Sequence, residues 1–237
     1  MDEALTSIPF TRLLIIFIPS GILSFIIYSW SLEWKNSIYA LGRMLGQLII
    51  IGYFLSYIFD SNSSLIILCI LISMVVIASW IALRILNKKR INLLKYAIIA
   101  ISLGGGVILF IVTQLLLQLD PWYRPRIVIP LAGMIFSSAM NGVSLAAERL
   151  QAEIDKGIRF DDAKKIAFKA SLIPIINSLF AVGLVSLPGM MTGQILSGIS
   201  PLIAARYQIM VMCMIFNSVG LASYIFLVLL NPKRIKN

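Results

Sequence analysis

The residues of this chain that could do chemistry are polar side chains set within long apolar segments. Arg43 and Gln47 are four positions apart, so they share one face of a helix. Ser137 and Asn141 have the same spacing in a later segment, and Asn177 lies in a third. Guanidinium, amide and hydroxyl groups can bind a solute through charge and hydrogen bonds. The pattern therefore indicates solute binding or hydrogen bonding between helices.

Catalysis by this chain is not predicted. The chain contains no histidine, and none of its ten Asp and Glu residues lies deep in an apolar segment. An enzyme within the membrane needs a general base in its bundle, and Glu148 is the only candidate near a polar helix face. A carboxylate cage for a hard cation is not predicted either, so any metal ligands stay unknown.

Two explanations remain open for the polar groups. Arg43 can reach the lipid headgroups from the cytoplasmic end of its segment, or it faces the bundle and pairs with Glu148 or an anionic substrate. Ser137 and Asn141 can hydrogen-bond to neighbouring helices. Alternatively, they form a polar wall of a translocation pathway together with Asn177.

The stretch SLPGMMTG (186–193) predicts a broken helix. Pro188 removes a hydrogen bond, Gly189 and Gly193 weaken a helix, and lipid offers no replacement partner for a freed backbone group. We therefore expect a hinge or re-entrant gate, bordered by protein or water. The thioethers of Met190 and Met191 suit a soft metal such as Cu(I), but methionine in an apolar helix usually serves packing.

The elements that position these residues are membrane helices. The 237 residues are 59% hydrophobic and 13% charged, with a mean hydropathy of +0.96, whereas soluble domains contain about 25% charged residues. No segment with the composition of a linker divides the chain, which predicts one transmembrane domain over 1–237. We expect this domain to lie in the lipid bilayer of the cell inner (plasma) membrane. The net charge of +10 does not indicate nucleic-acid binding, since no basic groove with interleaved aromatic residues is visible.

Seven apolar windows are long enough to span a membrane, which takes about 20 residues. The predicted fold is therefore an all-α, polytopic bundle of about seven transmembrane helices. The windows are 9–30, 37–59, 64–86, 96–117, 127–147, 170–193 and 207–230. An outer N-terminus and a cytoplasmic C-terminus place all basic residues except Arg12, Arg124, Arg126 and Arg206 on the cytoplasmic side, as the positive-inside rule favours.

The charged segment from Glu148 to Ser171 predicts a long cytoplasmic loop containing a short amphipathic helix, capped by Asp161 or Asp162. It is either a solvated loop on the headgroups or a coupling element that binds a separate ATPase. The chain has no P-loop: Gly104-Gly105-Gly106 lacks the following Lys-Ser/Thr. This triplet instead predicts close helix packing.

Three stretches resemble the FetB/YbbM family of ABC transporter permeases, which is linked to iron export and has plant relatives associated with aluminium tolerance. They are GRMLGQLIIIGYFLSYIF (42–59), IPLAGMIFSSAMNGVSLAAERL (129–150) and VGLVSLPGMMTGQILSGISPLIAARYQIMVM (182–212). The resemblance implies a non-catalytic permease homodimer that works with two ATP-binding subunits. ATP and Mg would bind to those subunits, and this chain would hold no cofactor.

The resemblance also implies that the 148–171 segment contacts the ATPase. The candidate contact residues are Glu153, Gly157, Phe160, Ala163, Ile166 and Ala167. Two other functions stay open. A secondary, ATP-independent transporter would normally need an intramembrane carboxylate for proton coupling, and an ABC permease could instead carry a non-metal solute such as a nucleotide sugar.

Overall fold

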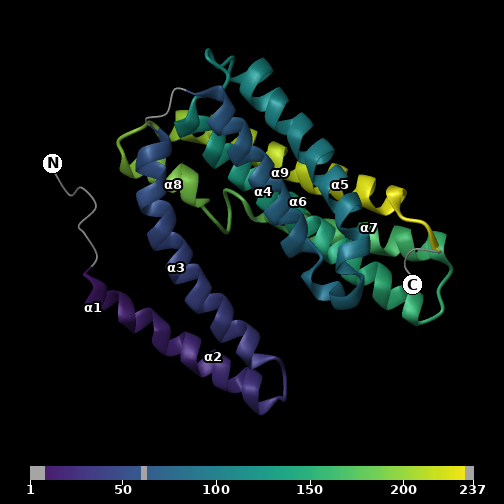
Figure 1. Cartoon of the computed structure of the whole chain (residues 1–237). Coiled ribbons are helices and arrows are strands. Elements are labelled where there is room, and N and C mark those ends of the chain that lie inside the picture. The colour runs from purple at the N-terminus through teal and green to yellow at the C-terminus, as the bar shows by residue number, and fades with distance from the viewer. Residues whose placement is uncertain (1–8, 60–62, 233–237) are drawn as a thin grey trace. The chain divides into compact units, whose positions relative to one another are not determined.

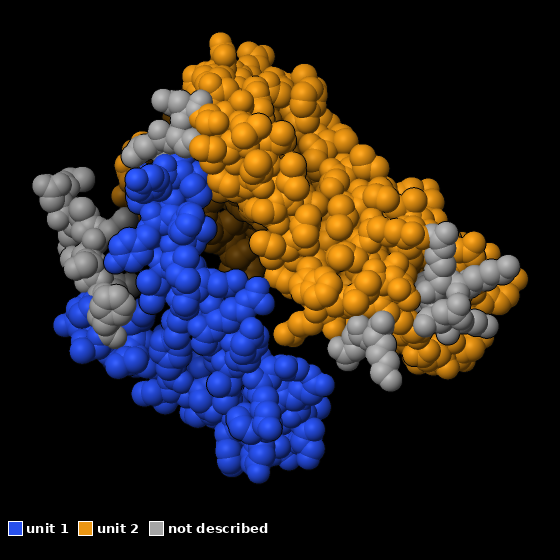
Figure 2. All heavy atoms as spheres, viewed as in Figure 1, with its two compact units in different colours: residues 1–61 blue, residues 62–237 orange. Residues whose placement is uncertain are grey.

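The structure is a computed structural model that describes residues 9–59 and 63–232. Within these ranges it is helical, apart from short connections and one isolated bridge between Val182 and Ser186. The chain divides into two compact units, residues 1–61 and 62–237 (Figure 2). The single transmembrane domain expected over 1–237 stays a prediction. Lys233, Arg234 and Lys236, which support the predicted orientation, lie outside the described residues.

The first unit is a pair of apolar helices. Its elements are α1 (Phe10–Leu13), η1 (Leu14–Ile16), α2 (Phe17–Ser29) and α3 (Trp34–Phe59). The rings of Tyr28 and Trp34 pack edge to face across the α2–α3 turn, with centroids 5.7 Å apart. None of the described side chains of this unit is buried within the chain. Helices that are apolar on all sides need lipid or other protein around them.

The second unit contains the core of the protein (Figure 1). Helices α5, α6 and α9 pack on one another, α7 packs on α6 and α9, and α4 packs on α5 and α6. Its elements are α4 (Ser64–Ala82), η2 (Arg84–Lys89), α5 (Arg90–Phe110), the π-helical turn η3 (Ile111–Leu116), α6 (Pro125–Asp155), α7 (Phe160–Ala181), α8 (Gly189–Leu196) and α9 (Pro201–Leu229).

Small residues bring the central helices into close contact. A Cβ atom on Gly104 of α5 would lie 2.5 Å from the backbone nitrogen of Ala222 in α9. A Cβ atom on Gly142 of α6 would lie 2.7 Å from the hydroxyl of Ser223. The packing role predicted for the glycine triplet is confirmed for Gly104, because only a residue without a side chain fits there.

The polytopic helical bundle is confirmed. Among the described residues, six helical segments are long and apolar enough to cross a membrane: 11–29, 34–59, 64–82, 90–116, 125–155 and 201–229. The single span predicted over 170–193 is wrong. That window is divided between α7, which ends at Ala181, and the short helix α8, which begins at Gly189.

Candidate functional site

A polar face of α6 points away from the rest of the second unit. Ser137, Asn141 and Glu148 are exposed on this face, and the hydroxyl of Ser137 donates to the carbonyl oxygen of Met134 at 3.2 Å. Gly142, next to Asn141, instead lies against α9. The predicted polar face of α6 therefore exists, and this unit does not cover it.

Asn177 of α7 lies level with this polar face along the axis of α6. Helices α6 and α7 pack together as a hairpin joined by a short turn. Ser138 comes 17 residues before the end of α6 at Asp155, and Asn177 comes 17 residues after the start of α7 at Phe160. Equal rise per residue places the two at one level in an antiparallel hairpin. Asn177 is also exposed.

The segment between α7 and α9 forms a compact corner. Gly183 adopts a left-handed φ of +83° directly after α7, and its amide donates to the carbonyl oxygen of Ser186 at 3.0 Å. Gly198 adopts a φ of +86° between α8 and α9. Glycine suits both positions because it has no Cβ to clash there. A break in the helix is confirmed, but it lies at 182–188, before Gly189 and Gly193, which are helical members of α8. The gate that it was expected to form stays a prediction.

The SLPGMMTG residues build α8 rather than interrupt a longer helix. Pro188 occupies the N-cap position of α8, and Gly189 and Gly193 are helical members of α8 with open space around them. Met190 and Met191 are half-buried, and Met190 packs against the hydrophobic core. Soft-metal binding by these thioethers stays untested. No group of three or more Cys, Asp or Glu side chains that could hold a metal ion occurs in the part of the chain that the structure describes.

Helix α6 ends in a network of charges. The carboxylate of Glu153 is buried, with 5% of the residue exposed. It lies 2.7 Å from the guanidinium of Arg149 and 3.4 Å from the ammonium of Lys156. Two residues before Glu153, Gln151 accepts a hydrogen bond from Lys89 at 3.2 Å and joins this end of α6 to the α4–α5 connection. The network fixes the end of α6 against a neighbouring turn.

The prediction of a long loop over 148–171 is wrong, because most of this segment is helical. Residues 148–155 continue α6, residues 160–171 begin α7, and only 156–159 are non-helical. The turn depends on Gly157, which has a φ of +82°. The turn and the end of α9 share one end of the unit, because Phe160 and Leu230 line a common pocket (Figure 1).

The candidate ATPase contacts divide into two groups. Glu153, Ala163 and Ala167 are buried in the bundle, so they are not on an accessible surface. Phe160 and Ile166 are half-buried, and Gly157 is exposed. The sequence argument missed Ile158, which is 40% exposed at the tip of the turn. An isolated apolar residue after a glycine was the available signal.

The start of α7 is held by an ion pair rather than by the predicted cap. Arg159, not Asp161 or Asp162, occupies the N-cap position. Its Nε donates to the carboxylate of Asp162 at 2.9 Å. This hydrogen bond and the positive charge of Arg159 lower the pKa of Asp162. The same hydrogen bond and the negative charge of Asp162 raise the pKa of Arg159. The pair keeps opposite charges together at an exposed turn.

Arg43 and Gln47 lie together on α3. With its amide oxygen turned toward the guanidinium, Gln47 accepts hydrogen bonds from Nε and Nη2 of Arg43 at 3.1 and 3.3 Å. Both side chains are exposed in the first unit. The shared face is confirmed, whereas a pairing of Arg43 with Glu148 stays a prediction.

Six membrane-length helices among the described residues define a multi-pass helical membrane protein. The chain belongs to the UPF0014 family, described as an uncharacterised protein family, whose model matches residues 10–159 and 160–234. The resemblance to the FetB/YbbM permeases is confirmed by the relatives of this family.

Three relatives show the range of the family. The chain is 36% identical over 193 residues to the UPF0014 membrane protein slr1647 of Synechocystis, covering 75% of this chain and 74% of the relative. It is 34% identical over 206 residues to the probable iron export permease protein FetB of Escherichia coli, covering 81% and 78%. It is 32% identical over 213 residues to the protein ALUMINUM SENSITIVE 3 of Arabidopsis thaliana, covering 83% and 76%. No solved structure matches the chain.

Proposed function

We propose that this chain is the permease subunit of an ABC transporter, working as a homodimer with a separate ATP-binding subunit. The observation that carries this proposal is the α6–α7 hairpin. Helix α6 has 31 residues, which at 1.5 Å per residue is about 46 Å long, whereas the hydrocarbon core of a bilayer is about 30 Å thick. Its charged end, from Glu148 onward, therefore projects beyond the hydrocarbon core.

The tip of this hairpin suits a docking role. The turn is short and held by the Glu153 network and the Arg159–Asp162 pair, so it behaves as a rigid projection. Ile158 and Gly157 are exposed at the tip. An exposed apolar residue on a rigid projection can insert into a groove of a soluble subunit. A push on the tip would then move α6 and α7 as rigid bodies.

The solute we propose is iron or a related metal solute, carried outward, because one relative is named a probable iron export permease. Ser137 and Asn141 offer neutral hydroxyl and amide groups on the exposed face of α6, and Glu148 adds a carboxylate nearer its charged end. The neutral groups can hydrogen-bond to the ligands of a complexed metal, whereas one carboxylate is too few for the cage of oxygen ligands that a bare hard cation takes. We therefore expect iron to pass as a complex.

The partner is tested by purifying the tagged full chain from its native membranes in mild detergent and identifying co-purifying proteins by mass spectrometry. We expect an ATP-binding subunit in stoichiometric amount, lost in Ile158→Asp. Ile91→Asp is the matched control, because Ile91 is 75% exposed at the α4–α5 connection. Absence of any ATP-binding subunit, or equal loss in both variants, would refute the docking role.

The solute is tested by reconstituting the purified complex in vesicles and measuring movement of citrate-bound iron with and without ATP. Transport that needs ATP supports the permease, and transport without ATP indicates a secondary transporter. Transport of a nucleotide sugar but not of complexed iron would replace the proposed solute while leaving the ABC mechanism in place.

A further inference from the structure

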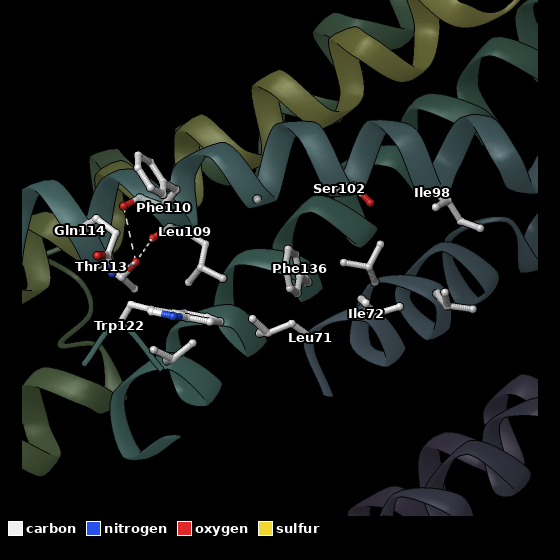
Figure 3. A pocket seen from close by; sticks show the side chains of 14 residues that line it. Leu71, Ile72, Ile98, Ser102, Leu109, Phe110, Thr113, Gln114, Trp122 and Phe136 are labelled. Atoms are coloured by element: carbon white, nitrogen blue, oxygen red, sulfur yellow. Dashed lines mark hydrogen bonds between the residues drawn. The ribbon is translucent and has the colours of Figure 1, made fainter. Parts of the chain in front are cut away.

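The second unit contains an apolar cavity of about 500 Å³ between α4, α5 and α6 (Figure 3). Aliphatic and aromatic side chains line most of it, including Leu71 and Ile72 of α4, Leu109 of α5 and Phe136 of α6. The size is within the range of about 300–1,000 Å³ that is typical of ligand sites. The proposed transport function uses none of these residues.

Ser102 lies near Ile98, and the other polar groups of the cavity lie at the opposite end (Figure 3). Thr113, Gln114 and Trp122 lie together at this end, while Ile98 and Ile72 lie at the other (Figure 3). The hydroxyl of Thr113 donates to the carbonyl oxygen of Leu109 at 2.8 Å, so its own hydrogen bond is satisfied. Trp122 lies in the α5–α6 connection, next to the membrane-length helices. Tryptophan is enriched at this level, where the headgroups begin.

The cavity is long and narrow. Its lining on α5 and η3 extends from Ile98 to Gln114, and 16 residues of helix correspond to about 24 Å. A volume of about 500 Å³ spread over that length describes a narrow channel. A single hydrocarbon chain fits this shape, and a protein helix does not.

We propose that the cavity binds one acyl chain of a membrane phospholipid. The chain lies along α5 between Leu71 of α4 and Phe136 of α6, and the ester and headgroup lie near Gln114 and Trp122. Helices α4 and α5, which supply most of the lining, are of membrane length. Lipid therefore meets the cavity at the depth of its own hydrocarbon. The apolar lining supplies the affinity, and the polar end fixes the direction of the chain.

Gly106 provides the space for this acyl chain. It lines the cavity, and a Cβ atom on Gly106 would meet nothing within 4 Å. Gly106→Phe therefore fills the cavity without a backbone clash. Leu103→Phe is the matched control, since Leu103 lies on the same helix, is 52% exposed and is not part of the lining.

The test uses the fluorescence of Trp122 in the purified full chain, with Trp30, Trp34 and Trp80 replaced by Phe. A phosphatidylglycerol with bromine atoms on one acyl chain is titrated into the detergent solution, because bromine quenches tryptophan only at close contact. We expect quenching that saturates near one lipid per chain. We expect Gly106→Phe to weaken the apparent affinity at least tenfold and Leu103→Phe to leave it unchanged.

Two results would overturn the proposal. Quenching that rises in proportion to the lipid fraction without saturation would mean that Trp122 senses bulk lipid only. Equal behaviour of the Gly106 and Leu103 variants, or no quenching at all, would mean that the cavity is closed or covered by protein. Gly106→Leu serves as a second variant if Gly106→Phe does not elute as a single species, and it should weaken saturable binding in the same direction.

Discussion

Replacing Gly104 by alanine should destabilise the protein, because the new methyl group would meet backbone atoms. The added Cβ would lie 2.5 Å from the nitrogen and 2.7 Å from the Cα of Ala222. Favourable carbon contacts need about 3.5–4.0 Å, so α5 and α9 would have to separate by roughly 1 Å at this crossing. Overpacking typically costs about 1–3 kcal/mol. We expect the upper end of this range, since a backbone cannot rotate away as a side chain can.

Gly106→Ala is the matched control for this clash. Gly106 lies on the same helix, and its Cβ would meet nothing within 4 Å. Both substitutions gain the helix propensity of alanine over glycine, about 1 kcal/mol. The difference between the two variants therefore isolates the clash, which we place at about 3 kcal/mol.

The difference is measurable as a melting temperature of the purified proteins in one detergent. For a chain of this size, 1 kcal/mol shifts the Tm by about 2–4 °C, so the Gly104 variant should melt about 6–12 °C below the Gly106 variant. Equal melting temperatures would refute the close α5–α9 contact. A Gly106 variant that melts lower than the Gly104 variant would contradict the assigned packing faces.

Three further predictions concern transport and the turn before α7. Asn141→Leu should leave folding intact, since the side chain is exposed, and should lower transport in vesicles at least tenfold; unchanged transport would remove Asn141 from the pathway. The leucine of Gly189→Leu enters open space, so this variant should still assemble. If the segment acts as a gate, the variant should stop transport, and normal transport would contradict the gate. The pair with Arg159 lowers the pKa of Asp162, so its stabilisation is present above the ordinary carboxyl pKa and is lost as the pH falls through the lowered value. Arg159→Ala should raise the pKa of Asp162 toward its ordinary value. Between about pH 5 and 8 the carboxyl group stays ionised in both proteins, as carbon NMR of this group can show.

Apolar length was sufficient to predict most of the fold. Segments such as 64–82 and 201–229 have few polar interruptions, and lipid leaves the helix as the natural structure for them. The window 170–193 failed because hydropathy alone cannot tell one span from a helix, a turn and a second helix. The turn at Gly183 depends on a left-handed backbone. Glycine permits that conformation without requiring it.

The candidate site was predictable in residue types but not in exposure. Spacing correctly placed Ser137 and Asn141 on one face and Arg43 beside Gln47. Spacing also grouped Ala163 and Ala167 as an apolar face, but it could not say which partner that face meets. They pack inside the bundle, which is where an apolar face goes when neighbouring helices are available.

Helix α6 links the two ends of the proposed mechanism. It carries the polar residue Asn141 on one face and Gly142, in close contact with α9, on another. It continues unbroken through Pro130 and reaches the buried Glu153 at its other end. A packed helix of this length transmits a displacement along its axis, because its backbone hydrogen bonds resist compression and the core around it is dense. Under the proposed function, a force applied by an ATP-binding subunit at the tip would therefore move the polar face and α9 together. The close contact of Gly142 with Val219 and Ser223 is where α6 would pass that displacement to α9.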